Sequence, residues 1–225
     1  MSAPTSHHPR RRRQADRVAL SDRRLTDAAI ELLIERGTAG TTLQAIGERA
    51  GYSRGLVTHR FGSKAGLFRH VLHDVTQLWR ERLEAAVAGR TGIDAICAAA
   101  DALRRFITEE PDRLRAMYML WFLSIDPSAE FRANVAEALK VQRADVARWV
   151  REGQARGAIA SDVSPVRFAE QFCASTYGIV YQWLFGREVS HERMYREFIA
   201  DIRARLDPAQ QRAPRPSQNG RMLRP

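Results

Sequence analysis

Several features that mark other classes of protein are scarce or missing in this sequence. It has only two cysteines, Cys97 and Cys173, and neither stands in a paired spacing such as C-x-x-C that would hold zinc or exchange thiols. No apolar run approaches the roughly 18 residues of a membrane helix, and no apolar signal segment opens the chain. We therefore expect both cysteines to be core residues and the protein to be cytoplasmic.

Motifs of catalysis are missing as well. No nucleophile-base-acid set, phosphate-binding glycine loop or metal motif stands at a recognisable spacing. His70, His73 and Asp74 share one helical face and could offer ligands to a metal, but no fourth ligand accompanies them, so packing or surface exposure is the simpler interpretation. We expect no catalytic residue, metal or cofactor. A helical enzyme or membrane-surface protein is the third-ranked class.

The charge that is present is mostly positive and lies near the N-terminus. The 225 residues hold 36 Lys and Arg against 26 Asp and Glu, a net charge of +10. Residues 1–70 alone hold 13 basic and 6 acidic residues, a net of +7. Such a patch favours an anionic partner, and because no long apolar face accompanies it, double-stranded DNA is favoured over a membrane.

Between its two ends the chain has the periodicity of helices. Residues 1–20 include the run Arg10–Arg13 and lack apolar spacing, and residues 207–225 are rich in Pro, Gln and Arg, so both are expected to be a disordered basic arm and tail. Elsewhere apolar residues recur every three or four positions, and no apolar-polar alternation supports a sheet. The predicted fold class is all-α.

The first predicted helix runs from Asp22 to Arg36, with Ser21 as its N-cap and Gly37 as its left-handed stop. A second helix begins at Thr42, where Thr41 and Gln44 have the spacing of a capping box. Its buried stripe is predicted to consist of Leu43, Ile46 and Ala50.

A third and a fourth helix follow closely. Gly51 ends the second helix, Ser53 caps a helix over residues 54–60, and Ser63 caps another that begins at Lys64. Short helices joined by a glycine-containing turn form a helix-turn-helix, here residues 42–61, whose second helix enters the major groove of DNA. Capping alone is the minimal interpretation of the hydroxyl residues. The predicted DNA contacts are Thr41, Thr42, Tyr52, Ser53, Arg54, Gly55, Thr58, His59, Arg60 and Lys64.

Residues 25–69 resemble the DNA-binding domain of TetR-family regulators. The resemblance depends on the joint spacing of Gly37, Thr41-Thr42, Ile46, Ala50-Gly51, Ser53, Gly55, Phe61, Lys64 and Leu67. It implies that Phe61 packs the helices together and that Lys64 touches phosphate. The family usually has Tyr where Thr58 stands, so Thr58 is expected to meet a thymine methyl instead. On this basis residues 21–68 are the DNA-binding domain and residues 69–206 a larger helical domain for ligand binding and dimerisation.

Helical periodicity continues over residues 64–88, 93–108, 111–124, 128–155, 164–185 and 190–206. The resemblance implies that the last two helices pair with those of a second subunit. Their apolar stripes suit either the core or this homodimer. The stripes consist of Phe168, Phe172, Ser175, Ile179 and Gln182, and of Met194, Phe198, Ile202 and Leu206.

Eight aromatic and Met side chains in the larger helical part could line a ligand pocket or simply fill the core. They are Phe106, Met117, Tyr118, Trp121, Phe122, Phe172, Tyr177 and Trp183. The sequence therefore predicts a transcriptional regulator, a repressor released from a palindromic operator by a small apolar effector. The alternative is a DNA-binding regulator controlled by a protein partner without a small-molecule ligand.

Overall fold

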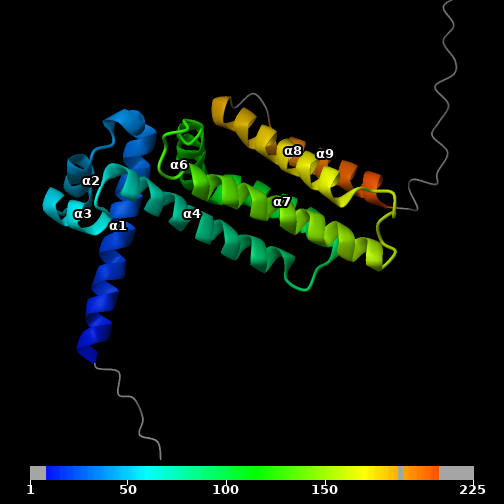
Figure 1. The fold of residues 1–225 in the computed structure, drawn as a ribbon, viewed down its shortest axis with the longest axis horizontal. Coiled ribbons are helices and arrows are strands. Elements are labelled where there is room, and N and C mark those ends of the chain that lie inside the picture. The colour runs from blue at the N-terminus through cyan, green and yellow to red at the C-terminus, as the bar shows by residue number, and fades with distance from the viewer. Residues whose placement is uncertain (1–8, 187–189, 208–225) are drawn as a thin grey trace, which may run out of the picture. The chain divides into compact units, whose positions relative to one another are not determined.

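The computed structural model describes residues 9–186 and 190–207, with side chains from Arg17 onward. Over these ranges the chain forms nine helices and no strand (Figure 1). They are α1 (Pro9–Gly40), α2 (Leu43–Ala50), α3 (Arg54–Phe61), α4 (Lys64–Val87), α5 (Gly92–Glu109), α6 (Pro111–Leu123), α7 (Arg132–Ala155), α8 (Pro165–Phe185) and α9 (His191–Leu206). The all-α prediction is confirmed. None of these helices is long and apolar enough to cross a membrane.

Contacts within the chain group it into two compact units. Unit 1 comprises Met1–Arg82 with Phe106–Ala138, and unit 2 comprises Leu83–Arg105 with Leu139–Pro225. Helix α6 and the first residues of α7 thus belong to the same unit as the N-terminal helices. The predicted domain boundary after residue 68 follows the family resemblance and stays a prediction.

Helix α1 begins earlier than the sequence predicted. Pro9 occupies its first position, and the helix continues to a break at Gly37, whose φ of 67° confirms the predicted stop. Ser21 is therefore no N-cap, and its hydroxyl donates to the carbonyl of Val18 at 2.8 Å. Residues 9–20, predicted as a disordered arm, are helical because Arg, Gln and Ala favour helix and no Gly or Pro interrupts them. Residues 1–8 lie outside the described part.

The start of α2 also differs from the prediction by one residue. Thr42, not Thr41, is the N-cap, and its side chain accepts a hydrogen bond from the Ala45 amide at 3.1 Å. Thr41 is fully buried and donates to the carbonyl of Gly37 at 2.7 Å, which satisfies an acceptor left free at the break of α1. Gln44 contacts Glu48 and does not complete a capping box.

The core of unit 1 lies among α1, α2, α4 and α6. Many of its fully buried side chains are aliphatic residues from these four helices, spaced by three or four positions as amphipathic helices require. They include Leu25, Leu32, Leu33, Ile46, Leu67, Val71, Leu114 and Leu120. In the predicted stripe of α2, Ile46 is buried, whereas Leu43 and Ala50 are half-buried.

Arg113 ties α6 to two other helices of unit 1. Its guanidinium lies 2.7 Å from Asp27 of α1, 3.0 Å from Asp74 of α4 and 3.3 Å from Glu110. The side chain is only 22% exposed, so these charges are partly shielded from water. Asp74 is thus engaged in an ion pair and not grouped with His70 and His73. No group of three potential ligands in the described residues could hold a metal ion.

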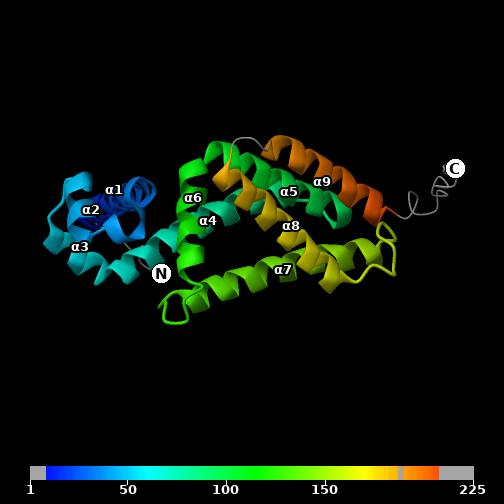
Figure 2. The ribbon, with the colours of Figure 1, turned by 90° about the horizontal axis from the view of Figure 1, so that it is seen from above.

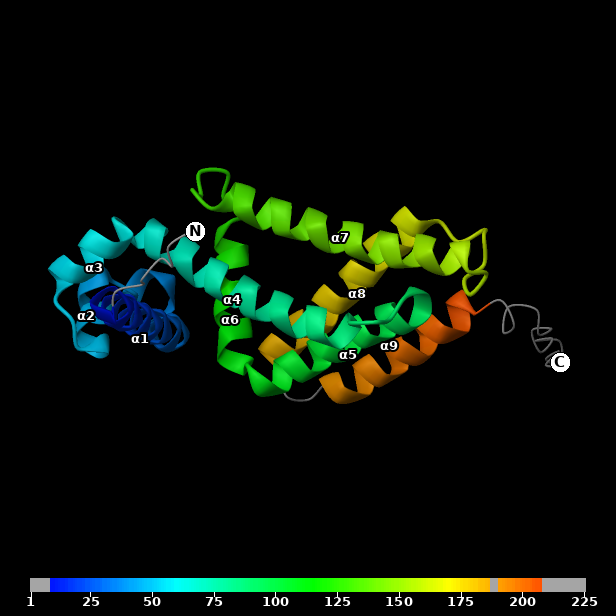
Figure 3. The same cartoon turned by 90° about the horizontal axis from the view of Figure 1, so that it is seen from below.

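In unit 2, α8 and α9 pack side by side (Figure 1), and α9 runs antiparallel along α5 (Figures 2 and 3). Two ion pairs mark the two ends of this contact, Arg104 with Glu192 at 2.8 Å and Arg203 with Asp94 at 3.4 Å. Cys97 and Cys173 are free and buried, as predicted, and burial raises the pKa of each thiol.

The helices after α3 agree with the predicted ranges to within two residues, except at the start of α7. That helix begins at Arg132 and not at residue 128. The carboxylate of Asp126 accepts hydrogen bonds from the backbone amide and the hydroxyl of Ser128, both at 2.8 Å, which forms a turn ahead of the helix. These bonds also lower the pKa of Asp126. The predicted tail beyond residue 207 lies outside the described part.

Candidate nucleic-acid interface

Helices α2 and α3 form a tight turn. Gly51 has the left-handed conformation, with φ 79° and ψ 30°, and ends α2 as predicted. The Tyr52 amide donates to the carbonyl of Gly47 at 2.7 Å, so the chain folds back closely on α2. A Cβ atom at Gly47 would lie 2.7 Å from the carbonyl oxygen of Tyr52. Only glycine therefore allows this approach without a shift of the backbone.

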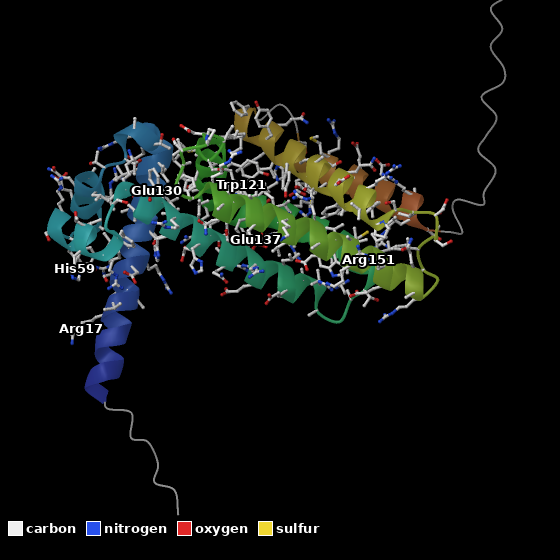
Figure 4. The ribbon with its side chains drawn as sticks, in the orientation of Figure 1. Arg17, His59, Trp121, Glu130, Glu137 and Arg151 are labelled. Carbon is white, nitrogen blue, oxygen red and sulfur yellow. The ribbon has the colours of Figure 1, made fainter. Side chains whose placement is uncertain are left out.

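Helix α3 shows most of its surface to solvent. Val57 is its only fully buried side chain, and Phe61 at its end is half-buried, as a packing residue should be. Five of the predicted DNA contacts are exposed on this helix: Arg54, Gly55, Thr58, Arg60 and His59, the last labelled in Figure 4. A helix held by one buried side chain and otherwise uncovered suits insertion into a groove.

Hydroxyl groups stand at the N-termini of both helices. The Ser53 side chain accepts from the Leu56 amide at 3.2 Å, and Thr42 caps α2 in the same way. Both residues are exposed, and Tyr52 between the helices is half-exposed. Exposed helix N-termini attract phosphate because their amides and dipoles favour anions. Thr41 is the exception among the predicted contacts, since its side chain is buried and engaged with Gly37.

The cations that follow Thr58 are placed by contacts with other helices. Arg60 forms an ion pair with Asp22 of α1, and this hydrogen bond raises the pKa of the guanidinium, which stays charged. Lys64 is half-buried, with its ammonium 3.4 Å from the carbonyl of Ala39 and 5.6 Å from the ring centre of Phe68. Ser63 accepts from the Gly66 amide at 3.0 Å, as expected of the cap of α4.

An ion-pair cluster holds α2 against α1. Arg49 lies 2.7 Å from Glu35 and 3.0 Å from Glu31. The hydrogen bond from Arg49 lowers the pKa of Glu35, and the two carboxylates raise the pKa of Arg49. The sequence alone did not identify this cluster, because its members are 14 and 18 residues apart.

One exposed side chain of α3, Leu56, is not among the predicted DNA contacts. Leu56 is 40% exposed on α3, next to Gly55 and Thr58. An exposed Leu on a short helix otherwise lined by polar groups is suited to contact a thymine methyl. The sequence signal for its exposure is its position two residues after Arg54, which places it on a different side of the helix from the buried Val57.

The predicted pocket residues do not gather at one site. Phe106, Met117 and Tyr118 are buried in unit 1, where burial also raises the pKa of Tyr118. Phe122 is exposed, and Trp121 is half-exposed. Phe172, Tyr177 and Trp183 belong to unit 2, where Phe172 packs on Phe198 and the Tyr177 hydroxyl lies 2.6 Å from Gln142.

The predicted dimer residues are divided between the core and the surface of unit 2. Phe168, Phe172, Ile179, Ile202 and Leu206 are buried within the chain, which favours the core interpretation for them. Ser175 and Gln182 are exposed, and Met194 and Phe198 are half-buried. Periodicity identified the right helices, but it could not distinguish the face that packs inside the chain from the outer face.

Comparison with known proteins agrees with this geometry. Residues 25–71 match the model of the bacterial regulatory proteins of the tetR family. By this segment, the chain resembles the regulatory proteins of the TetR family. The matched TetR segment contains α2, α3 and the exposed side chains described above.

A TetR-family relative with similar sequence is the HTH-type transcriptional regulator BetI of Paraburkholderia xenovorans (strain LB400). It is 42% identical over 80 residues, which cover 33% of this chain and 41% of the relative. BetI of Burkholderia thailandensis is likewise 42% identical over 83 residues. The match spans less than half the length of these curated relatives.

Solved TetR-like structures match the fold over most of the chain. A TetR transcriptional regulator from Chloroflexus aurantiacus J-10-FL aligns with a TM-score of 0.72 and 23% identity, over 84% of this chain and 97% of that one. AibR in complex with isovaleryl coenzyme A and operator DNA aligns with a TM-score of 0.65 and 17% identity, over 80% and 97%. At these identities the likeness concerns the fold.

Proposed function

We propose that this protein is a transcriptional repressor that binds a palindromic operator as a homodimer and is released by a small molecule. The observation that carries the proposal is the exposure of α3, on which Arg54, Thr58 and His59 are uncovered while Val57 anchors the helix. A recognition helix needs this arrangement, because its outer side chains must reach base edges while its inner side holds its position.

The contacts are proposed to be of two kinds. Arg54, in the first turn of α3, is placed to donate two hydrogen bonds to a guanine, and Thr58 and Leu56 are placed to meet a thymine methyl. Thr42, Ser53 and Lys64 bind phosphates, which fix the register and carry no sequence information. Tyr52 and His59 border the same face, and Arg60 reaches phosphate if it leaves Asp22.

A second copy of the chain is proposed to cover the outer face of α8. Tyr181 and Phe185 are 48% and 74% exposed there, with ring centres 4.8 Å apart, and Ser175 and Gln182 of the predicted stripe are exposed on the same helix. Exposed aromatic pairs of this kind mark interfaces. Two recognition helices are also needed because one covers too few base pairs for specificity.

Regulation by a small molecule is proposed by analogy with a fold relative. AibR was solved with isovaleryl coenzyme A and with operator DNA. The sequence led us to expect an apolar effector. In unit 1, however, the cavity beside α3 is lined by cations as well as apolar groups, so we propose an effector with a negative charge.

Two substitutions test the DNA interface. Arg54→Ala should relax base preference at one position of the operator, by about 1 to 3 kcal/mol, because it removes a base contact. Lys64→Ala should weaken binding to all sequences alike and lower the salt dependence, because it removes a phosphate contact. The measurement is a gel shift with DNA from the promoter next to the protein's own gene, compared with random DNA.

Arg80→Ala serves as the matched control, since Arg80 is an exposed cation on α4 outside the interface. It should leave both affinities unchanged. Equal losses on specific and random DNA for the Arg54 and Lys64 variants would show that the assignment of roles is wrong. Absence of specific binding by the unaltered protein would reject the proposed function.

A further inference from the structure

Unit 1 contains a cavity that directly adjoins the recognition helix. Its volume is about 600 Å³, and it is lined from the last turn of α3, from α4, from α6 and from the first two turns of α7. Trp121 of α6, one of its lining residues, is labelled in Figure 4. Its size falls in the range of sites for small organic ligands. Of the pocket residues predicted from sequence, only Trp121 lines it.

The polar groups of this cavity are cations and neutral donors. Arg60 and Arg69 line it together with His70 and His73, whereas no carboxylate is among the lining residues. Each of the two arginines pairs with an acid outside the lining, Arg60 with Asp22 and Arg69 with Glu130. A cavity with two guanidinium groups and no acid on its wall favours an anionic ligand.

The two arginines differ in how firmly they are engaged. Arg60 makes a hydrogen-bonded ion pair with Asp22. Arg69 lies 3.8 Å from Glu130, and their side chains are 49% and 59% exposed, so this contact is a weak surface pair. A carboxylate in the cavity can therefore replace Glu130 on Arg69 at little cost, and the planar guanidinium offers it two parallel hydrogen bonds.

The remaining wall of the cavity is apolar and partly aromatic. Phe61 and Trp121 line it, with Leu72 and Val135, and the ring of Phe61 lies 5.0 Å from that of His70. Such a wall accepts the flat face of an aromatic ligand or a short hydrocarbon body. We propose that this cavity is a binding site for hydrophobic carboxylates, with Arg69 holding the carboxylate and Phe61 and Trp121 contacting the body.

The location of the site suggests what its occupant does. Arg60 and Phe61 are the last two residues of α3, so a bound carboxylate contacts the recognition helix itself. A ligand whose body packs on Phe61 changes the contacts that hold the last turn of α3. Binding is therefore coupled to DNA affinity, a consequence that depends on the proposed repressor function, whereas the binding site itself does not.

Calorimetry on the full chain tests the site with naphthalene-2-carboxylate and its neutral analogue naphthalene-2-carboxamide. The carboxylate should bind at least about tenfold more tightly than the carboxamide, because the charge strengthens its hydrogen bonds to Arg69. Arg69→Gln should remove this difference, and Arg80→Gln should retain it. Equal affinities in the unaltered protein, no binding of the carboxylate, or equal effects of the two variants would overturn the proposal.

Tryptophan fluorescence locates the probe. A carboxylate bound in the cavity should quench Trp121, so Trp121→Phe should lose the response and Trp149→Phe should keep it. A response that persists in Trp121→Phe would place the probe elsewhere and overturn the site. Thermal unfolding of each variant checks that it is folded.

The coupling is tested by repeating the gel shift with the carboxylate. DNA affinity should fall by about 5- to 150-fold, the usual range of allosteric coupling, and the fall should vanish in Arg69→Gln. If the probe binds but DNA affinity is unchanged, the regulatory role is rejected, whereas the proposal of a carboxylate-binding site is still supported. If the free protein binds no specific DNA, the proposed repressor function fails while the calorimetric result still decides the site.

Discussion

Two glycines of the helix-turn-helix have opposite surroundings, although each lies inside a short helix. Gly47 is buried in α2, where a Cβ atom would lie 2.7 Å from the carbonyl oxygen of Tyr52. Gly55 is exposed in α3, and the nearest atom to its Cβ position is the Ser53 hydroxyl at 3.8 Å. Glycine is thus required by the fold at the first position, whereas at the second we propose that its small size serves the approach of DNA.

Alanine substitutions should separate these two roles. Gly47→Ala should destabilise the protein by about 1 to 3 kcal/mol, because the backbone of the turn must move. Gly55→Ala should stabilise α3 by up to about 1 kcal/mol, since alanine favours helix, and yet weaken DNA binding by occupying the exposed surface. Thermal unfolding and gel shifts measure the two effects. A loss of stability in Gly55→Ala, with DNA affinity retained, would contradict this account.

At the scale of elements, the packing of α2 on α1 depends on a charged cluster. Arg49 of α2 bonds to Glu35 and Glu31 of α1, and its hydrogen bond lowers the pKa of Glu35. Because the pKa of Glu35 is lower in the folded state, its carboxylate stabilises the fold fully at pH values above the ordinary pKa range of glutamate. This stabilisation is lost as the pH falls through the lowered pKa.

Glu35→Gln should therefore lower the melting temperature at pH 7 and have a smaller effect near about pH 3, because the stabilisation by the carboxylate is lost as the pH falls. Glu84→Gln, at an exposed carboxylate of α4, is the control and should change neither value. Melting curves at the two pH values decide the matter. If Glu35→Gln lowers the melting temperature equally at both pH values, the ion pair is not the cause of the loss.

At the scale of the whole molecule, the proposed dimer depends on the outer face of α8. Tyr181→Glu and Phe185→Glu should produce monomers in sedimentation experiments, because each places a charge on an exposed aromatic surface that a second copy would bury. Both should also weaken binding to a palindrome while preserving weak binding to a single half-site. Ile125→Glu, at a residue that is 67% exposed outside α8, is the matched control. Dimers that persist in both α8 variants would place the interface elsewhere.

Much of the DNA-binding segment was predictable because its signals are local. The stop at Gly37, the left-handed turn at Gly51 and the caps at Ser53 and Ser63 depend on the conformational preferences of single residues. The sequence by itself therefore determined the all-α class, the helix-turn-helix and the family resemblance. The start of α1 was mispredicted because helix propensity extends a helix without any apolar stripe, and periodicity does not register it.

Tertiary structure decided the features that depend on which helix faces which. It buried Phe168 and Ile179 and left Tyr181 exposed, a choice that periodicity leaves open because both sides of α8 carry apolar residues. It also assembled the cavity, whose lining residues Arg60, Arg69 and Trp121 come from three helices and lie up to 61 residues apart in the sequence. Packing alone brings such distant side chains together, because no short-range preference links residues so far apart along the chain.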